Sequence, residues 1–357
     1  MNLKRDDDWL LIRAWLVAAM VADIPRPVIL FHGAQGSAKS TAASMLRALV
    51  DPSACDNIDL GRDPSALAQA LDHHSVPFFD NLSAITKWQA DLLCKAVTGG
   101  GFMKRELYSD SEDILMAFRR AIILTGVNVP THQPDLLDRT ILVELERVSS
   151  DKRLRDRDIW ERFESERPKI LGALLDELVG ALREHKHVQL DKLPRMADYA
   201  VLGAAASEAN GTGKDAFMAA LAANSERQTA EVIESDPLGA AIIALMKNRD
   251  EWSGSNVSEL MKAIDPGDPK PEGWPKGARS AACRLRLLQS ALFDVGLRVT
   301  FERGGKNRTR TVSIRKFASF ASFASADSVN PCFNRGPMAD AKRTQRTQKC
   351  VHPRQRK

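Results

Sequence analysis

The sequence predicts an α/β protein, in which a core of strands and helices is followed by a helical segment, a smaller domain and a basic tail. Three observations lead to this fold class. The short apolar run "PVILFHG" at 27–33 passes through a glycine-bearing loop into the helical pattern "KSTAASMLRALVDP" at 39–52. Two further short apolar runs, at 75–83 and 120–130, have the length of buried strands. Beyond residue 236 the pattern changes to a basic amphipathic helix and two alternating strands.

Composition limits the class of protein. The 357 residues are 44% hydrophobic and 27% charged, which is ordinary for a globular chain of two or three domains. The five cysteines lie far apart and lack the spacing of metal ligands, so we expect a reducing, cytoplasmic environment. The apolar run at 9–22 is too short to span a bilayer and contains Arg13. It therefore predicts a buried helix, and no membrane is expected as a partner.

We expect four segments along the chain. These are a nucleotide-binding core at 1–150, a helical lid or linker at 151–235, a winged-helix domain at 236–316 and a disordered tail at 317–357. From residue 303 onward, 14 Lys and Arg stand against two acidic residues, although the net charge of the chain is only +5. A basic C-terminal part predicts a polyanion such as DNA as the partner, whereas the alternative is a solvated tail without a partner.

The stretch "HGAQGSAKS" at 32–40 almost matches the phosphate-loop pattern G-x-x-x-x-G-K-[ST]. Backbone N–H groups of such a loop, with the N-terminus of the following helix, favour phosphate oxygens. Lys39 would reach the β- and γ-phosphates of ATP, and Ser40 would give its hydroxyl to Mg²⁺. Ala38 replaces the second glycine, which is tolerable if its φ is negative; the alternative is a chance loop of small residues. The predicted nucleotide-binding residues are Gly33, Ala34, Gln35, Gly36, Ser37, Ala38, Lys39, Ser40 and Thr41.

An acidic residue follows the second predicted strand. In "SVPFFDNLS" at 75–83, Asp80 occupies the position from which a carboxylate can hold the water shell of Mg²⁺. Together with Ser40 it forms the predicted metal site. The next residue is Asn81, which can orient water but cannot accept its proton. Hydrolysis is therefore expected to be slow, unless another carboxylate acts as the base.

Two further positions are candidates for the chemistry of a γ-phosphate. The strand "RAIILTGVNVP" at 120–130 ends in Thr125 and Asn128, and either side chain could sense the phosphate or the attacking water. Arg139 lies just ahead of the alternating strand "TILVELE". It could complete the site of a neighbouring subunit as an arginine finger, and the alternative is a structural salt bridge with a nearby acid.

With these motifs in this order, the chain resembles AAA+-type ATPases of the superfamily 3 helicase kind, as in the ATPase half of phage and plasmid primase–helicases. The resemblance spans roughly residues 6–185, continues more weakly to 316, and rests most on "TGGGFMKRELYSDSEDILMAFRRAIILTG" at 98–126. This stretch predicts two strands around an acidic turn. The resemblance implies a homo-oligomeric ring, with a hairpin that carries Lys104 and Arg105 onto single-stranded DNA in the channel. Arg119 and Arg120 would lie at the hairpin's far end.

The segment at 151–235 reads as helical. Apolar residues recur at three- and four-residue intervals, and Pro168 is expected to open a second helix at its first turn. The stretch "NGTGKD" at 210–215 resembles a phosphate loop but has no preceding strand, so we expect a turn between helices.

Residues 236–316 have the pattern of a winged helix: three helices and a basic hairpin. Ser255 or Asn256 could cap the second helix. Contact with duplex DNA requires basic side chains on one face, and a winged helix that binds protein is the alternative. The candidates are Arg279, Arg284 and Arg286 on the recognition helix, and Arg303, Lys306, Arg308 and Arg310 on the wing. The repeat "KFASFASFASADS" at 316–328 and the tail beyond it predict disorder from composition.

These features predict an ATP-hydrolysing DNA helicase or translocase of a phage or other mobile element, active in DNA replication. The first alternative is a nucleotide-gated DNA-binding initiator or regulator with little hydrolysis, which Asn81 favours. The second is an inactive prophage remnant. Because the chain begins almost directly at the ATPase, we expect either a stand-alone protein or the remnant of a longer one.

Overall fold

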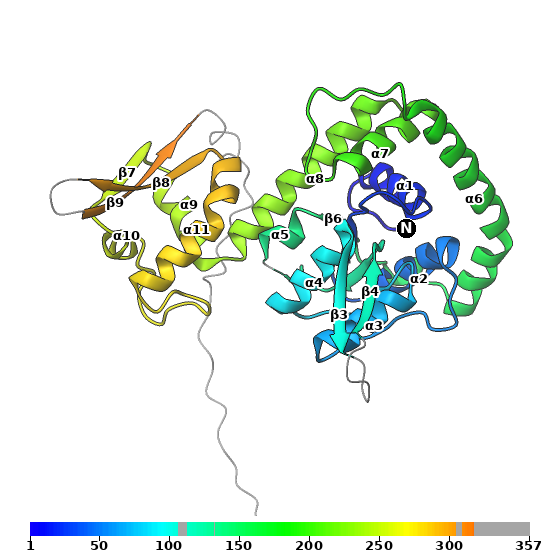
Figure 1. Ribbon diagram of the computed structural model, residues 1–357, viewed down its shortest axis with the longest axis horizontal. Helices are drawn as coiled ribbons and strands as arrows, with labels where there is room; N and C mark the ends of the chain where they lie inside the picture. Colours follow the sequence, from blue (N-terminus) through cyan, green and yellow to red (C-terminus); the bar gives the residue numbers. More distant parts are fainter. Residues whose placement is uncertain (106–112, 132, 305–308, 318–357) are drawn as a thin grey trace, which may run out of the picture.

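The computed structural model describes residues 1–105, 113–131, 133–304 and 309–317. The predicted disordered tail at 317–357 lies outside the described residues except for Phe317, and so do the predicted wing residues Lys306 and Arg308. Figure 1 shows two lobes, one around a sheet and one formed by the C-terminal elements, with a long helix between them. Within the described ranges, no helix is both long and apolar enough to cross a membrane.

A four-stranded parallel sheet forms the centre of the larger lobe. Its strands are β1 (Val28–His32), β2 (Phe78–Phe79), β5 (Ile123–Gly126) and β6 (Thr140–Glu144), in the order β2-β5-β1-β6. Strand β1 pairs with both β5 and β6, so that Leu30 faces Leu124 on one side and Leu142 on the other. These strands are almost fully buried, which explains their continuous apolar runs. The predicted α/β class is confirmed, and the structure shows that the sheet is parallel.

Helices cover the sheet. Helix α1 (Asp8–Ala19) is the predicted buried helix, and Trp15 at its centre donates a 2.8 Å hydrogen bond to the carbonyl of Pro27 just ahead of β1. Helix α2 (Lys39–Val50) follows the loop after β1 and packs on β1 and β5. The remaining helices of this half are α3 (Pro64–His73), α4 (Lys87–Thr98) and the short α5 (Pro134–Leu137).

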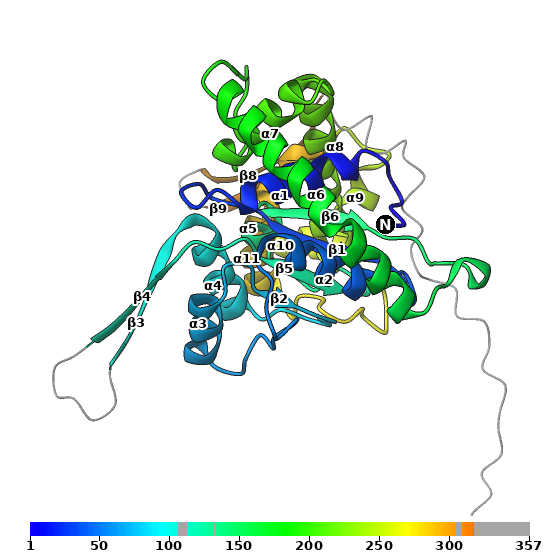
Figure 2. The same ribbon diagram turned by 90° about the vertical axis from the view of Figure 1, so that its right-hand side faces the viewer.

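A hairpin extends from this lobe. Strands β3 (Gly100–Arg105) and β4 (Asp113–Phe118) pair antiparallel, as the sequence predicts. Figure 2 shows the hairpin reaching away from the body of the lobe. Most of the predicted acidic turn lies outside the described residues.

Helix α6 (Asp156–Glu184), which follows the short 3₁₀ turn η1 (Ser150–Lys152), corrects one prediction: it runs without a break through Pro168. A proline inside a helix removes one hydrogen bond and crowds the preceding turn. Contacts beside the proline offset this cost, because Arg167 donates to the carbonyl of Ala48 at 2.7 Å and Phe163 and Leu174 are buried. The helix is curved along its length in Figure 1, as long helices that wrap a core commonly are.

Helices α7 (Ala197–Ala209) and α8 (Lys214–Glu234) are joined at "NGTGKD", so the expected turn is confirmed. Helix α8 also protects the edge of the sheet. The amide of fully buried Asn224 donates to the carbonyl of Leu142 at 2.8 Å and accepts from its N–H at 3.1 Å, while Gln228 donates to the carbonyl of Thr140. Side-chain amides thus satisfy the free backbone groups of edge strand β6.

The C-terminal lobe contains α9 (Pro237–Met246), β7 (Glu251–Gly254), α10 (Val257–Ala263), α11 (Ala278–Asp294), β8 (Leu297–Gly304) and β9 (Thr309–Lys316). Its sheet is antiparallel in the order β7-β9-β8. The sequence does not predict β7, because a four-residue edge strand with one buried residue has no periodic pattern of apolar residues. Of the two predicted caps for α10, the structure uses Asn256, whose Oδ1 accepts from the N–H of Glu259 at 3.0 Å.

Candidate nucleotide site

The loop after β1 lies between the carboxyl ends of β5 and β6. The N–H of Gly33 donates to the carbonyl of Val127 at 3.2 Å, and the N–H of Val148 donates to the carbonyl of Gly36 at 3.1 Å. Gly33 has a φ of +141°, and a Cβ built there would lie 2.3 Å from the carbonyl oxygen of Leu145. Only glycine fits at this position.

Ala38 requires a correction. A methyl group is tolerable there at negative φ, but Ala38 has φ +61° and ψ +32°, in the left-handed region. This is the conformation that the second glycine of the motif would adopt without strain. For alanine it costs about 1–2 kcal/mol. The alanine is therefore a strained substitute rather than a neutral one.

Lys39 folds back over the loop. Its Nζ donates to the carbonyls of Gly33 at 2.8 Å and Ala34 at 3.0 Å, and to the hydroxyl of Ser37 at 3.3 Å. Burial lowers the pKa of Lys39, while the carboxylate of Asp80 acts in the opposite direction. The ammonium group is thus held at the centre of the loop by weak neutral acceptors, which a phosphate oxygen could replace.

Three side chains from different elements meet beside the start of α2. The hydroxyl of Ser40 donates to Oδ1 of Asp80 at 2.7 Å, and the hydroxyl of Thr125 donates to the same oxygen. Hydroxyl and carboxylate oxygens are ligands that suit Mg²⁺, and neighbouring ligands in an octahedral shell lie about 2.9 Å apart. The spacing of Ser40 and Asp80 therefore fits the predicted metal.

The structure separates the roles of the two sensor candidates. Thr125 is only 1% exposed, and its Oγ1 both donates to Asp80 and accepts from the N–H of Asn81 at 2.7 Å. It therefore positions the carboxylate. Asn128 is exposed on the turn after β5 and remains available to a ligand. Asn81, with φ +54°, is also exposed beside the cluster.

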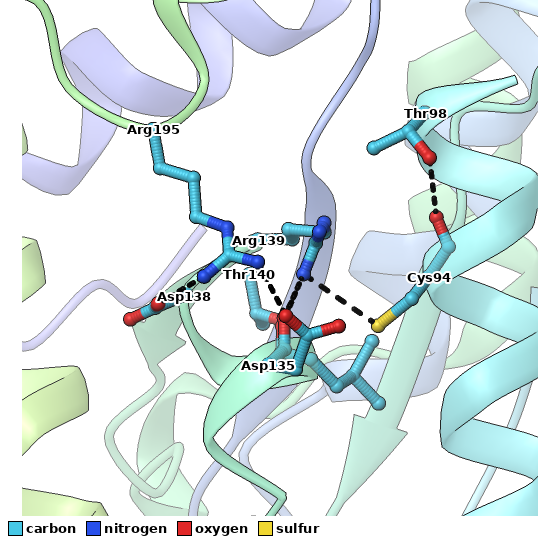
Figure 3. Close-up of polar contacts among 8 residues, drawn as sticks. Cys94, Thr98, Asp135, Asp138, Arg139, Thr140 and Arg195 are labelled. Carbon is cyan, nitrogen blue, oxygen red and sulfur yellow. Dashed lines mark hydrogen bonds and ion pairs between the residues drawn. The ribbon is translucent and has the colours of Figure 1, made fainter. Parts of the chain in front are cut away.

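Arg139 lies at the amino ends of the strands, whereas the loop lies at their carboxyl ends. Its carbonyl accepts from the N–H of Val28 at the start of β1, whereas the loop follows the end of that strand. Its side chain is 14% exposed and forms an ion pair with Asp135 at 2.6 Å, shown in Figure 3. Burial acts to raise the pKa of Asp135, but the hydrogen bond from Arg139 brings it below its ordinary value. Arg195 contacts both Asp135 and Asp138. In this chain, Arg139 thus makes the structural salt bridge that was its alternative role.

The strand residue before the loop carries an electrostatic feature of its own. Burial lowers the pKa of His32 to about 4, although nearby Glu144 acts to raise it. The imidazole is therefore neutral at ordinary pH. Glu144 pairs with Lys4 at 2.6 Å, so the charge beside this strand end is already balanced.

Several predicted DNA-contacting arginines have partners within the chain. Arg284 on α11 forms an ion pair with Asp236, whose side chain is 3% exposed and which caps α9. Arg286 lies over the ring of Phe301, 4.8 Å from its centroid, while Arg279 is exposed.

The other predicted basic residues lie in two hairpins. Arg303 and Arg310 are paired in the register of β8 and β9, and Lys104 and Arg105 lie at the outer end of β3. At the base of the β3–β4 hairpin, Arg119 donates to the carbonyl of Asp23, and Arg120 donates to that of Leu71 at 2.6 Å. Both of these arginines are therefore bound to the body of the lobe.

The comparisons with known proteins establish a family. The family described as "Actinomycete integrative conjugative element replication protein" matches residues 1–226, more than half of the chain. The chain belongs to this family of replication proteins. Residues 238–328 match the family's C-terminal domain, described as "AICE RepA C-terminal domain". The expected link to replication of a mobile element is thus confirmed, whereas the superfamily 3 resemblance remains a prediction.

Solved structures also show similarity to this replication protein. One is described as "SCCmec type IV Cch - active helicase", with 13% identity, a TM-score of 0.44, and coverage of 91% of this chain and 72% of that one. Another is the apo C-terminal region of NrS-1, with 12% identity, a TM-score of 0.38, and coverage of 87% and 71%. Because both TM-scores are below 0.5, these similarities do not establish a shared fold. The comparison with curated proteins gave no match.

Proposed function

We propose that this replication protein binds Mg·ATP at residues 33–41 and hydrolyses it to drive movement along DNA. The observation that carries the proposal is the convergence of Ser40, Asp80 and Thr125 beside the glycine loop. The three residues come from α2, from the end of β2 and from β5. The N-terminus of α2 lies at the same end of the sheet, and a helix N-terminus favours anions.

Each residue has a distinct role in this proposal. Lys39 exchanges its bonds to loop carbonyls for bonds to phosphate oxygens. Ser40 and Asp80 would hold Mg²⁺, which would supply positive charge against the phosphates of the nucleotide. Thr125 fixes the orientation of Asp80, and Asn128 orients the attacking water. Asn81 stands where many ATPases carry a glutamate and can only orient water, so the turnover expected is slow.

DNA is the partner that these elements suit best. We propose a winged-helix fold for the C-terminal lobe, because α9, β7, α10, α11 and the β8–β9 hairpin follow the order of that fold. The projecting β3–β4 hairpin would contact single-stranded DNA through Lys104 and Arg105 in a homo-oligomeric ring of the AAA+ superfamily 3 type. Arg139 could act in trans only after it releases Asp135.

A second candidate function is nucleotide-gated DNA binding with little hydrolysis, as in an initiator. Asn81 is the observation that favours it. Its N–H is bonded to Thr125, its side chain is exposed, and it cannot take a proton from water. In this case ATP would change DNA affinity without measurable turnover.

A single set of assays tests both candidates. Titrations of Mg·ATP and measurements of phosphate release, with and without single-stranded DNA, would be made for the wild type, Lys39→Ala and Asp80→Ala. We expect binding that Lys39→Ala weakens and turnover that Asp80→Ala abolishes. Binding without turnover would favour the gated function. Equal ATP binding by the wild type and Lys39→Ala would contradict the nucleotide site.

A further inference from the structure

The loop at 33–40 is covered by a segment that the phosphate motif does not include. Residues 145–153, between β6 and α6, run along the loop: Leu145 bonds to the carbonyl of His32 at 2.9 Å and Val148 to that of Gly36 at 3.1 Å. The two ends of this segment are fixed by strand β6 and by helix α6. The backbone of this segment is therefore held beside the loop.

One side chain of this segment is that of Arg153. A Cβ built at Gly36 would lie 3.2 Å from Nη2 of Arg153 and 4.0 Å from its Cζ, so the guanidinium lies directly against the loop. A side chain at position 36 would crowd the guanidinium, and the φ of +77° at Gly36 also favours glycine there. The only hydrogen bond of the Arg153 side chain among the described residues is a long one, 3.4 Å from Nε to the carbonyl of Val148. Its two terminal nitrogens remain available.

The charge of Arg153 is also unpaired. Two arginines that follow it have acidic partners, because Arg155 pairs with Asp158 and Arg157 with Glu161. Arg153 is exposed and forms no ion pair within the ranges that the structure describes. A guanidinium fork that faces a glycine loop without a carboxylate suits a bidentate anion, above all a phosphate group.

We propose that Arg153 is a phosphate-binding residue that acts in the same chain as the loop. It would contact β- or γ-phosphate oxygens of the nucleotide in addition to Lys39. The proposal rests on the nucleotide site described above and adds a second cation to it. It also gives Gly36 a second role, because the absence of a side chain there leaves room for the guanidinium.

The test uses the full chain and measures binding of AMP-PNP, ADP and AMP with Mg²⁺ by calorimetry. The variants are Arg153→Ala, Arg153→Lys and Lys39→Ala, with Arg157→Ala as the matched control, since Arg157 lies four residues away and pairs on the helix surface. A hydrogen bond to a charged group contributes enough to change affinity roughly tenfold or more. We therefore expect Arg153→Ala to weaken AMP-PNP binding by about that factor and to leave AMP unchanged.

The other variants separate the possible failures. The affinity of Arg153→Lys for AMP-PNP is expected to lie between those of the wild type and Arg153→Ala, because the charge remains while the planar guanidinium is lost. Arg157→Ala should bind AMP-PNP as tightly as the wild type does. If Arg153→Ala binds AMP-PNP normally while Lys39→Ala does not, Arg153 has no role and the nucleotide site stands. If Lys39→Ala also binds normally, the nucleotide site itself is wrong and the proposal falls with it. If Arg157→Ala weakens AMP-PNP binding as much as Arg153→Ala does, the effect comes from the net charge of the protein, and the proposal is wrong.

Discussion

Replacing Ala38 by glycine should stabilise the protein, although most changes to glycine destabilise. Ala38 sits at φ +61°, where its Cβ crowds the backbone, and relief of that strain amounts to about 1–2 kcal/mol. Glycine also increases the entropy of the unfolded chain, which opposes the gain by about 0.4–1 kcal/mol. The net expectation is a free energy of unfolding higher by about 0.5–1 kcal/mol.

Ala34→Gly provides the matched control. Ala34 lies in the same loop and is also exposed, but it does not have a positive φ. Glycine there relieves no strain and only adds unfolded-state entropy, so we expect a loss of about 0.4–1 kcal/mol. The two variants should therefore shift stability in opposite directions.

Urea unfolding followed by circular dichroism would measure both variants under identical conditions. Unchanged slopes against urea would show that the midpoints report stability alone. If Ala38→Gly and Ala34→Gly destabilise equally, the left-handed conformation at residue 38 is wrong. A parallel titration with Mg·ATP would then show whether the relaxed loop also binds nucleotide more tightly.

Three further changes test other parts of the structure. Asn224→Ala removes the partner of the buried N–H of Leu142 and leaves its carbonyl with only a 3.4 Å bond from Arg227, so it should lower the free energy of unfolding by about 1–3 kcal/mol in urea titrations. No measurable loss would contradict the role of Asn224 at the edge of β6. Because the folded-state pKa of His32, about 4, lies below its unfolded value, stability should fall as pH decreases from about 6.5 to 4, and His32→Gln should flatten that dependence. An unchanged slope would show that other groups control it. Arg284→Ala leaves the buried carboxylate of Asp236 without its charge partner and should lower the melting temperature of the C-terminal lobe. Normal melting together with weaker DNA binding would instead assign Arg284 to the DNA surface.

The sequence alone determined the order of the main elements. A buried strand needs a short apolar run and a helix needs apolar residues at three- and four-residue spacing, and both conditions are local. For that reason β1, α2, β5, β6 and the β3–β4 hairpin could be predicted. The glycine loop was recognisable too, since its residues are consecutive. Local patterns also placed Asp80 at a strand end.

The tertiary structure decided how these residues meet. The structure distinguishes Thr125 from Asn128, because the hydroxyl of Thr125 donates to Asp80. This contact exists because β2 and β5 are neighbours in the sheet. For Arg139, the acidic residue four positions earlier is visible in the sequence, but only the structure shows that the two side chains pair and that Arg195 joins them. The path of α6 through Pro168 likewise depends on contacts with α2, and no pattern around the proline reports them.

The same reason explains the features that the sequence reading did not find. In the sequence, nothing distinguishes Asn224 from other polar residues of a helix, and its role follows from its contact with the backbone of β6. Arg153 becomes notable only because the segment after β6 returns over the loop. Helix and strand formation depend on neighbours in the chain, whereas the contacts of Asp80 with Ser40 and Thr125, and of Asn224 with Leu142, join residues 40 to 82 positions apart. Which polar groups are satisfied, and which remain free for a ligand, is therefore set by packing.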